Sequence, residues 1–135
     1  MEAGSGQRLT GLRLLLVEDN LLNQQVACML LQAEGAAITV AGNGAEALAC
    51  VTAPGLFDAV LMDMQMPVMD GYEATRRLRA LGHTNLPILA LTAHVLDDER
   101  AACRAAGVND FIDKPIDFDA MIATVAHHCG RNQSP

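Results

Sequence analysis

Basic residues are scarce in this sequence. Nine Lys and Arg stand against sixteen Asp and Glu, which gives a formal net charge of −7. A nucleic-acid backbone requires a basic face on its partner, so this balance argues against direct binding to DNA or RNA. It also disfavours an anionic membrane surface. We therefore expect neither nucleic acid nor membrane among the direct contacts of this domain.

Long hydrophobic runs and paired cysteines are also lacking. The apolar runs are far shorter than the roughly 20 residues that cross a bilayer, and residues 1–10 are polar and Gly-rich rather than a signal sequence. None of the four cysteines lies close to another, which excludes a Cys-x-x-Cys metal or redox pair. These absences predict a cytoplasmic protein with reduced thiols.

What the sequence does have is a regular alternation of apolar runs and helical patterns, with 51% hydrophobic residues. Such alternation is typical of a parallel α/β sheet, and 135 residues suit one domain. We predict a doubly wound, five-stranded parallel sheet with five helices on both faces, flavodoxin-like and therefore of strand order 2-1-3-4-5. The expected strands are residues 12–17, 37–41, 59–62, 87–91 and 109–112.

The boundaries of the helices and of the domain follow from capping residues and from composition. Asn43 is expected to open the second helix, which would stop at Pro54, and Asp117 is expected to cap the fifth. The third helix is expected to turn its arginines, Arg79 among them, to solvent. We assign residues 1–10 to a linker or flexible N-terminus, 11–129 to the folded domain and 130–135 to a flexible C-terminus.

Polar residues follow four of the predicted strands at the point where each strand ends. They are Glu18 and Asp19, Asp63, Thr92 and Lys114. The carboxyl ends of parallel strands meet at one edge of the sheet, where ligands bind in open α/β folds. Each residue alone would more often be a cap or a solvated loop residue. Five suitable residues at four strand ends instead indicate a divalent cation and a phosphoryl group.

The chemistry of this set favours phosphoryl transfer. Three carboxylates repel one another and favour a cation, and hard oxygen ligands suit Mg²⁺. Asp63 is the expected nucleophile, because it lies centrally and a carboxylate can form an acyl phosphate. Lys114 would supply a positive point charge to the phosphoryl oxygens, and Thr92 would donate its hydroxyl to one of them.

With these residues placed, the sequence from about residue 12 to residue 125 resembles the receiver domains of two-component response regulators. Four motifs in the right order carry the resemblance. They are Val17-Glu18-Asp19-Asn20, Met62-Asp63-Met64-Gln65-Met66-Pro67-Val68-Met69-Asp70-Gly71, Leu91-Thr92-Ala93 and Asp113-Lys114-Pro115.

The resemblance implies that Asp63 takes a phosphoryl group from a phosphohistidine in a Mg²⁺-dependent reaction and slowly loses it again. Asp19, Asp63 and the backbone carbonyl of Gln65 would hold the metal, and Glu18 would bind metal-bound water. Thr92 and Lys114 would bind the acyl phosphate.

Further roles are implied by the same resemblance. Thr92 and Phe111 occupy switch positions, and Gln65 and His94 occupy positions that tune dephosphorylation. The peptide bond between Lys114 and its proline is expected to be cis.

The motif at residues 20–27 and the Met-Gln-Met-Pro run resemble the receivers of bacterial hybrid sensor histidine kinases most closely. The implied partners are a histidine kinase domain and a histidine phosphotransfer domain, with the chain a monomer or a weak phosphorylation-linked dimer. The domain would then be the cytosolic part of a membrane-anchored kinase. Two alternatives stay open: a stand-alone response regulator that acts by phosphorylation-dependent protein binding, and a Mg²⁺-dependent phosphohydrolase of the haloacid-dehalogenase type. The second typically needs an acid where this sequence has Gln65.

Overall fold

A parallel sheet with helices on both faces forms the structure, a computed structural model that describes residues 8–66, 68–93 and 97–130. The five strands lie in the order β2-β1-β3-β4-β5, and each neighbouring pair is parallel. The predicted fold and strand order are therefore confirmed. In chain order the elements are β1 Arg13–Val17, α1 Leu21–Ala33, β2 Ala37–Ala41, α2 Gly44–Cys50, β3 Ala59–Asp63, α3 Gly71–Ala80, β4 Ile88–Thr92, α4 Asp97–Ala106, β5 Asp110–Asp113 and α5 Phe118–His128.

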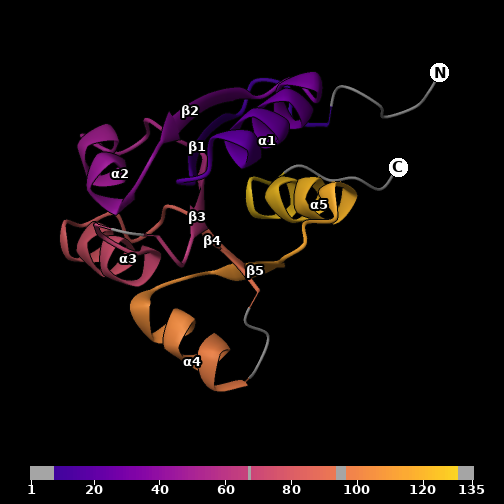
Figure 1. Cartoon of the computed structure of the whole chain (residues 1–135). Helices are drawn as coiled ribbons and strands as arrows, with labels where there is room; N and C mark the ends of the chain where they lie inside the picture. Colours follow the sequence, from indigo (N-terminus) through magenta and orange to yellow (C-terminus); the bar gives the residue numbers. More distant parts are fainter. Residues whose placement is uncertain (1–7, 67, 94–96, 131–135) are drawn as a thin grey trace.

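Two hydrophobic cores lie on opposite faces of the sheet, because successive side chains of a strand point to opposite sides. Leu14 and Leu16 of β1 belong to the core under α1 and α5. Leu15 and Val17 belong to the core under α2, α3 and α4. Figure 1 shows α1 and α5 on one side of the strands and the other three helices on the opposite side. The three central strands are thus buried on both faces, as their continuous apolar runs predict.

Four of the helices begin at a side-chain cap, and each follows a strand in the chain, so its first turn lies at the carboxyl edge of the sheet. Asn20, Asn43, Asp70 and Asp117 each accept a hydrogen bond from the backbone N–H three residues later. The predicted caps at Asn43 and Asp117 are confirmed. The second helix ends at Cys50 rather than at Pro54. It ends early because Val51 leaves the helical conformation and buries its side chain in the core.

Arg79 does not face solvent as the sequence predicted. Its guanidinium donates to the carbonyl oxygens of Gly107 and Leu86, both at 2.7 Å, and to the side-chain oxygen of Asn109 at 2.8 Å. The loops before β4 and β5 both turn back against the end of α3, and their backbone carbonyls need a donor there. Arg79 supplies it, so this side chain joins three segments instead of lying in water.

The segment before β1 packs against the domain at residues 8–10, which the sequence assigned to a linker. Leu9 is fully buried in the core under α1 and α5, and its N–H donates to the carbonyl of Glu34. The guanidinium of Arg8 pairs with the carboxylate of Glu34 at 3.0 Å. The folded part therefore reaches at least to Arg8, whereas the outer limits of the domain stay a prediction.

Within residues 8–66, 68–93 and 97–130, no helix is both long and apolar enough to cross a bilayer.

Candidate functional site

The sheet brings the predicted site residues together at the carboxyl ends of its strands. Asp63 and Thr92 are the last residues of β3 and β4, and each has only 2% of its surface exposed. Thr92 is paired in register with Asp113, and the N–H of Lys114 donates to the carbonyl of Thr92 at 2.9 Å. Glu18 follows β1 directly and is also buried. Strand register alone therefore gathers side chains from four distant segments.

Three carboxylates form the centre of the site. Oxygen atoms of Glu18, Asp19 and Asp63 lie within 4.8 Å of one another. Glu18 and Asp63 are buried, whereas Asp19 is exposed. This donor set fits Mg²⁺, which prefers hard oxygen ligands, needs few of them from the protein and keeps several waters. Because Asp19 is exposed, the cluster of carboxylates is open to solvent on the side of this residue.

Lys114 provides the positive charge nearest to the acids in the described part of the chain. Its Nζ lies 3.2 Å from Oδ1 of Asp63, and the backbone N–H of Gln65 donates to the same oxygen at 3.0 Å. The peptide bond between Lys114 and Pro115 is cis, as expected. One oxygen of Asp63 thus faces both an ammonium group and a backbone donor, an arrangement suited to hold negative charge on and around this carboxylate.

Burial controls the protonation of Glu18. Removal from water raises the pKa of this carboxyl above its ordinary value, and the negative charge of Asp63 raises it further. The backbone N–H of Asn20, which donates to its Oε2 at 3.1 Å, and the charge of Lys114 oppose that increase. The ionised form of Glu18 is therefore destabilised in the folded, metal-free protein.

Replacing Glu18 by glutamine is expected to stabilise the metal-free domain at neutral pH by about 1 kcal/mol, within the range of single stabilising substitutions. Because the folded pKa of this carboxyl is raised, its favourable contribution is complete below the ordinary pKa of glutamate and is lost as the pH rises through the folded pKa. Denaturant unfolding in a chelating buffer, from mildly acidic to neutral pH, measures the effect. A Glu18→Gln protein less stable than the wild type at neutral pH would contradict it.

The remaining predicted site residues are Phe111, Gln65 and His94. Phe111 has only 8% of its surface exposed and packs in the core under α2, α3 and α4. The side chain of Gln65 is exposed beside the acids. His94 lies outside the described residues.

Two neighbours of the site were not recognised from the sequence. Arg100 and Arg104 of α4 place their guanidinium carbons 4.7 Å and 4.9 Å from the ring centroid of Phe111. Arg100 also bonds Oδ1 of Asp113 at 3.1 Å. The only sequence signal was their spacing of four residues, which places two side chains on one face of a helix.

Gly71 allows α3 to begin close to the site. A Cβ atom at this position would lie 2.5 Å from the carbonyl oxygen of Asp63 and 2.8 Å from Cα of Met64. These are backbone atoms that cannot move aside cheaply. The glycine after Asp70 is therefore needed for the close approach of α3 to the end of β3.

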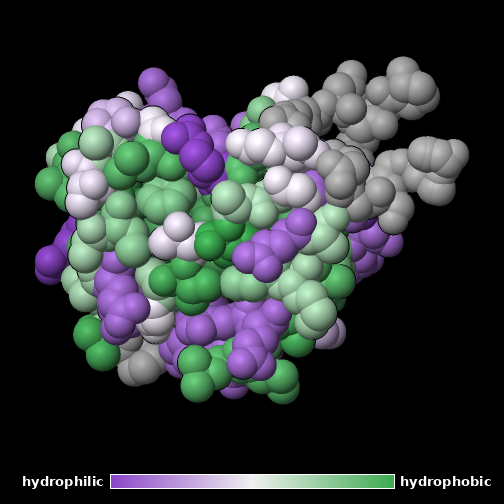
Figure 2. All heavy atoms as spheres, turned by 90° about the horizontal axis from the view of Figure 1, so that it is seen from above, coloured by the Kyte–Doolittle hydropathy of each residue, from purple (hydrophilic) through white to green (hydrophobic). Residues whose placement is uncertain are grey.

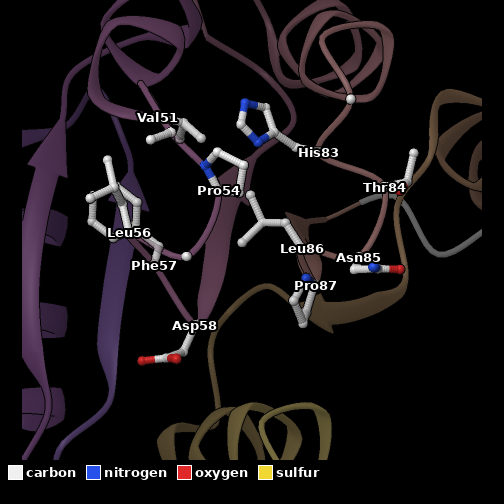
Figure 3. A pocket seen from close by; sticks show the side chains of 13 residues that line it. Val51, Pro54, Leu56, Phe57, Asp58, His83, Thr84, Asn85, Leu86 and Pro87 are labelled. Atoms are coloured by element: carbon white, nitrogen blue, oxygen red, sulfur yellow. The ribbon is translucent and has the colours of Figure 1, made fainter.

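A cavity of about 320 Å³ lies at the opposite edge of the sheet. The segment before β3 and the segment before β4 line it, and Figure 3 shows residues of the two segments, such as Phe57 and Leu86, on either side of it. Asp63 and Thr92 lie at the other ends of the same strands. This cavity is therefore separate from the acidic site.

Fold and site together define a doubly wound α/β domain with an acidic, lysine-containing site at the carboxyl edge of its sheet. The model of the response regulator receiver domain matches residues 14–126. The chain belongs to this family and is a receiver domain of two-component phosphorelay signalling.

Similar proteins include histidine kinases from several organisms. The chain is 40% identical over 129 residues to hybrid signal transduction histidine kinase B of Dictyostelium discoideum, covering 86% of this chain and 6% of the relative. It is 35% identical over 140 residues to probable histidine kinase 5 of Oryza sativa subsp. japonica, covering 88% of this chain and 12% of the relative. The chain thus spans only a small part of these relatives.

Solved structures show the same fold. The receiver domain of a sensor histidine kinase from Pseudomonas aeruginosa, crystallised with magnesium in its active-site cleft, is 37% identical with a TM-score of 0.81, covering 90% of this chain and 99% of that one. The receiver domain of Ssk1 from Saccharomyces cerevisiae, solved together with the histidine phosphotransfer protein Ypd1, matches with a TM-score of 0.84 at 26% identity, covering 90% of this chain and 91% of that one.

Proposed function

We propose that Asp63 accepts a phosphoryl group from a phosphohistidine and passes it to the histidine of a phosphotransfer domain. The observation that carries the proposal is the approach of the Lys114 ammonium to within 3.2 Å of Asp63, inside a cluster of three carboxylates. In the forward step an oxygen of Asp63 forms a bond to phosphorus while the bond from phosphorus to the histidine nitrogen breaks. The relay step reverses this exchange on a second histidine.

The residues around Asp63 have separate tasks in this reaction. Lys114 holds negative charge on the phosphoryl oxygens, and Thr92, at the end of the neighbouring strand, donates its hydroxyl to them. Asp19, Asp63 and the backbone carbonyl of Gln65 would hold Mg²⁺, and Glu18 would bind water attached to it. When bound, the cation would offset the repulsion between an anionic nucleophile and an anionic phosphoryl group.

Gln65 supports a receiver that keeps its phosphoryl group until a partner removes it. Its side chain is exposed beside Asp63 and carries an amide, which is not a general base. Water near the acyl phosphate would therefore lack a carboxylate base at this position. His94, which follows Thr92 by two residues, is proposed to act with Gln65 in setting the rate of dephosphorylation.

The surface beside the site suits a protein partner that carries the histidine. Helix α1 begins four residues after β1 and exposes large apolar side chains: Leu21 by 72%, Leu22 by 66% and Met29 by 62%. Seen from the side on which Figure 1 places β2 and α1, the surface carries separate hydrophobic areas between hydrophilic ones (Figure 2). Singly exposed apolar side chains are common on protein surfaces, but three large ones on the helix next to the acidic site suit a protein–protein contact. A helical partner that packs on α1 would bring its histidine to Asp63.

The relatives suggest the setting of this domain. Several of them are histidine kinases, one of them named as a hybrid kinase, and Ssk1 was crystallised with a phosphotransfer protein. We therefore propose that the chain functions within a hybrid histidine kinase in the cytoplasm, alongside a kinase domain and a phosphotransfer domain.

Phosphorylation by a small donor tests the central claim. Incubation with Mg²⁺ and acetyl phosphate is expected to add one phosphoryl group, visible by intact-mass analysis, and a chelator is expected to prevent it. The Asp63→Asn protein is the control and should gain nothing. A phosphorylated wild type should then lose its label to an added histidine phosphotransfer protein.

Two results would overturn the assignment. Equal labelling of the wild type and of Asp63→Asn would show that another residue is the acceptor. Undiminished labelling in the presence of a chelator would show that the reaction does not need the metal.

A further inference from the structure

Helix α4 buries little of its own side-chain surface against the sheet. Its buried residues are Cys103 and Ala106, both small. The long side chains that reach from α4 to β5 are those of Arg100 and Arg104, which lie over the ring of Phe111. Guanidinium groups at this distance are attracted by the negative face of an aromatic ring. The position of α4 beside β5 therefore depends in part on these two arginines.

Arg100 makes a second contact that Arg104 does not share in the described part of the chain. Its Nη2 lies 3.1 Å from Oδ1 of Asp113, the residue immediately before Lys114. The arginine is one-third exposed and Asp113 is 57% exposed, so the ion pair alone would be weak and loosely oriented. The ring of Phe111 restrains the same guanidinium. It thereby fixes the position of the group that pairs with Asp113.

We propose that Arg100 is a positioning residue for the Asp63 site: it joins the ring of Phe111 to Asp113 and so fixes where Lys114 lies. The backbone follows Asp113 directly into Lys114, whose N–H is bonded to the carbonyl of Thr92. We expect a displacement of Asp113 to shift the side chain of the adjoining Lys114. Its ammonium must stay near Oδ1 of Asp63, where it lies at 3.2 Å.

The part of this proposal that concerns reaction rate rests on the proposed phosphorylation of Asp63, whereas the position of Lys114 can be measured without it. Lys114 is the only lysine in the 135 residues. Lysine labelled with carbon-13 and nitrogen-15 therefore gives a single set of side-chain NMR signals, and these report directly on the ammonium group beside Asp63.

Three variants separate positioning from mere support of α4. Arg100→Gln removes both contacts, Asp113→Asn weakens only the pair with Arg100, and Arg104→Gln removes one arginine from the ring with the same change of charge as Arg100→Gln. In Arg100→Gln and Asp113→Asn we expect the Lys114 signals to move toward those of lysine in an unfolded peptide. In Arg104→Gln they should stay near their wild-type positions.

The kinetics of phosphorylation by acetyl phosphate give the second measurement. Arg100→Gln is expected to lower the maximal rate by a factor on the order of ten, since a small displacement of a charge-stabilising group has effects of this size or more. The half-saturating concentration of the donor should stay within about twofold, because initial binding is unchanged. Combining Arg100→Gln with Asp113→Asn should add little to the effect of Arg100→Gln alone, as expected for two residues that act through one contact.

The outcomes distinguish this proposal from the proposed function. Unchanged Lys114 signals in Arg100→Gln, or equal changes in Arg104→Gln, would overturn the positioning role. Shifted signals in a protein whose wild type is never labelled at Asp63 would support the positioning of Lys114 and defeat the proposed function instead. A labelled wild type and an Arg100→Gln protein of equal rate would overturn the effect on the reaction.

Discussion

Replacing Lys114 by methionine is expected to slow the phosphorylation of Asp63 by a factor on the order of a hundred, the usual cost of removing one group that stabilises transition-state charge. The ammonium is the cation within 3.2 Å of the carboxylate, and methionine keeps much of its aliphatic length but none of its charge. Negative charge that collects on the phosphoryl oxygens would lose its point-charge partner. Rapid-quench measurements with acetyl phosphate and Mg²⁺ give the rate.

Binding of Mg²⁺ should survive the same substitution. The three carboxylates remain within 4.8 Å of one another, and removal of a positive charge next to them favours a cation. Calorimetric titration with Mg²⁺ is therefore expected to show an affinity equal to or higher than that of the wild type. Slow phosphorylation combined with intact metal binding assigns the loss to the lysine charge and not to a collapsed site.

Lys114→Arg is the matched control for this experiment. It keeps the positive charge but replaces a compact ammonium by a planar group that spreads its charge over a larger area. We expect a rate between those of the wild type and Lys114→Met. Wild-type rates in the methionine protein would show that Lys114 does not act on the phosphoryl group.

Much of the site could be predicted because strand ends are encoded locally. Asp63 stands where a continuous apolar run ends. In a parallel sheet, such a residue lies at the carboxyl edge of the sheet. The same reasoning predicted that Lys114 lies near it, and its ammonium lies 3.2 Å from Asp63, whereas Thr92 ends the neighbouring strand. The fold followed from the alternation of runs and helical patterns, which depends on composition over short windows and not on distant contacts.

The errors and omissions have a different origin. Arg79 lies on a helix surface like Arg76 and Arg77, and nothing within α3 indicates that the loop after it and the distant loop before β5 supply carbonyl oxygens to it. The same holds for Leu9, whose burial depends on the end of α1. Arg100 and Arg104 lie over Phe111 in the fold in which β5 pairs with β4. The surroundings of a side chain therefore cannot be predicted from the sequence when its partners come from other segments.

Arg79 leads to a second large effect, this time on stability. Arg79→Met is expected to lower the free energy of unfolding by about 3 kcal/mol, since three partly buried acceptors each lose a hydrogen bond from a charged donor, worth about 1 kcal/mol or more apiece. The carbonyl oxygens of Gly107, His83 and Leu86 all accept hydrogen bonds from this guanidinium. Burial lowers the pKa of Arg79, but arginine stays charged in proteins, so the bonds remain charge-assisted.

The location of these acceptors predicts which part of the fold loosens first. Arg79 fixes the loop between α3 and β4, whose residues His83 and Leu86 line the cavity shown in Figure 3. In Arg79→Met, amide hydrogen exchange should therefore accelerate at the entry to β4 before it does at the acidic site. Phosphorylation of Asp63 should persist below the unfolding temperature, because Asp63 and Thr92 lie at the far ends of their strands.

Arg77→Met provides the comparison on the same helix. The Arg77 side chain is exposed and pairs with Glu73 on the helix surface, an arrangement that contributes little to stability. Its midpoint of thermal unfolding should stay close to that of the wild type, whereas that of Arg79→Met should fall by roughly 10 °C for a domain of this size. Equal midpoints for the two variants would mean that water replaces the guanidinium at the three carbonyls. The loops before β4 and β5 would then hold their positions through backbone pairing alone.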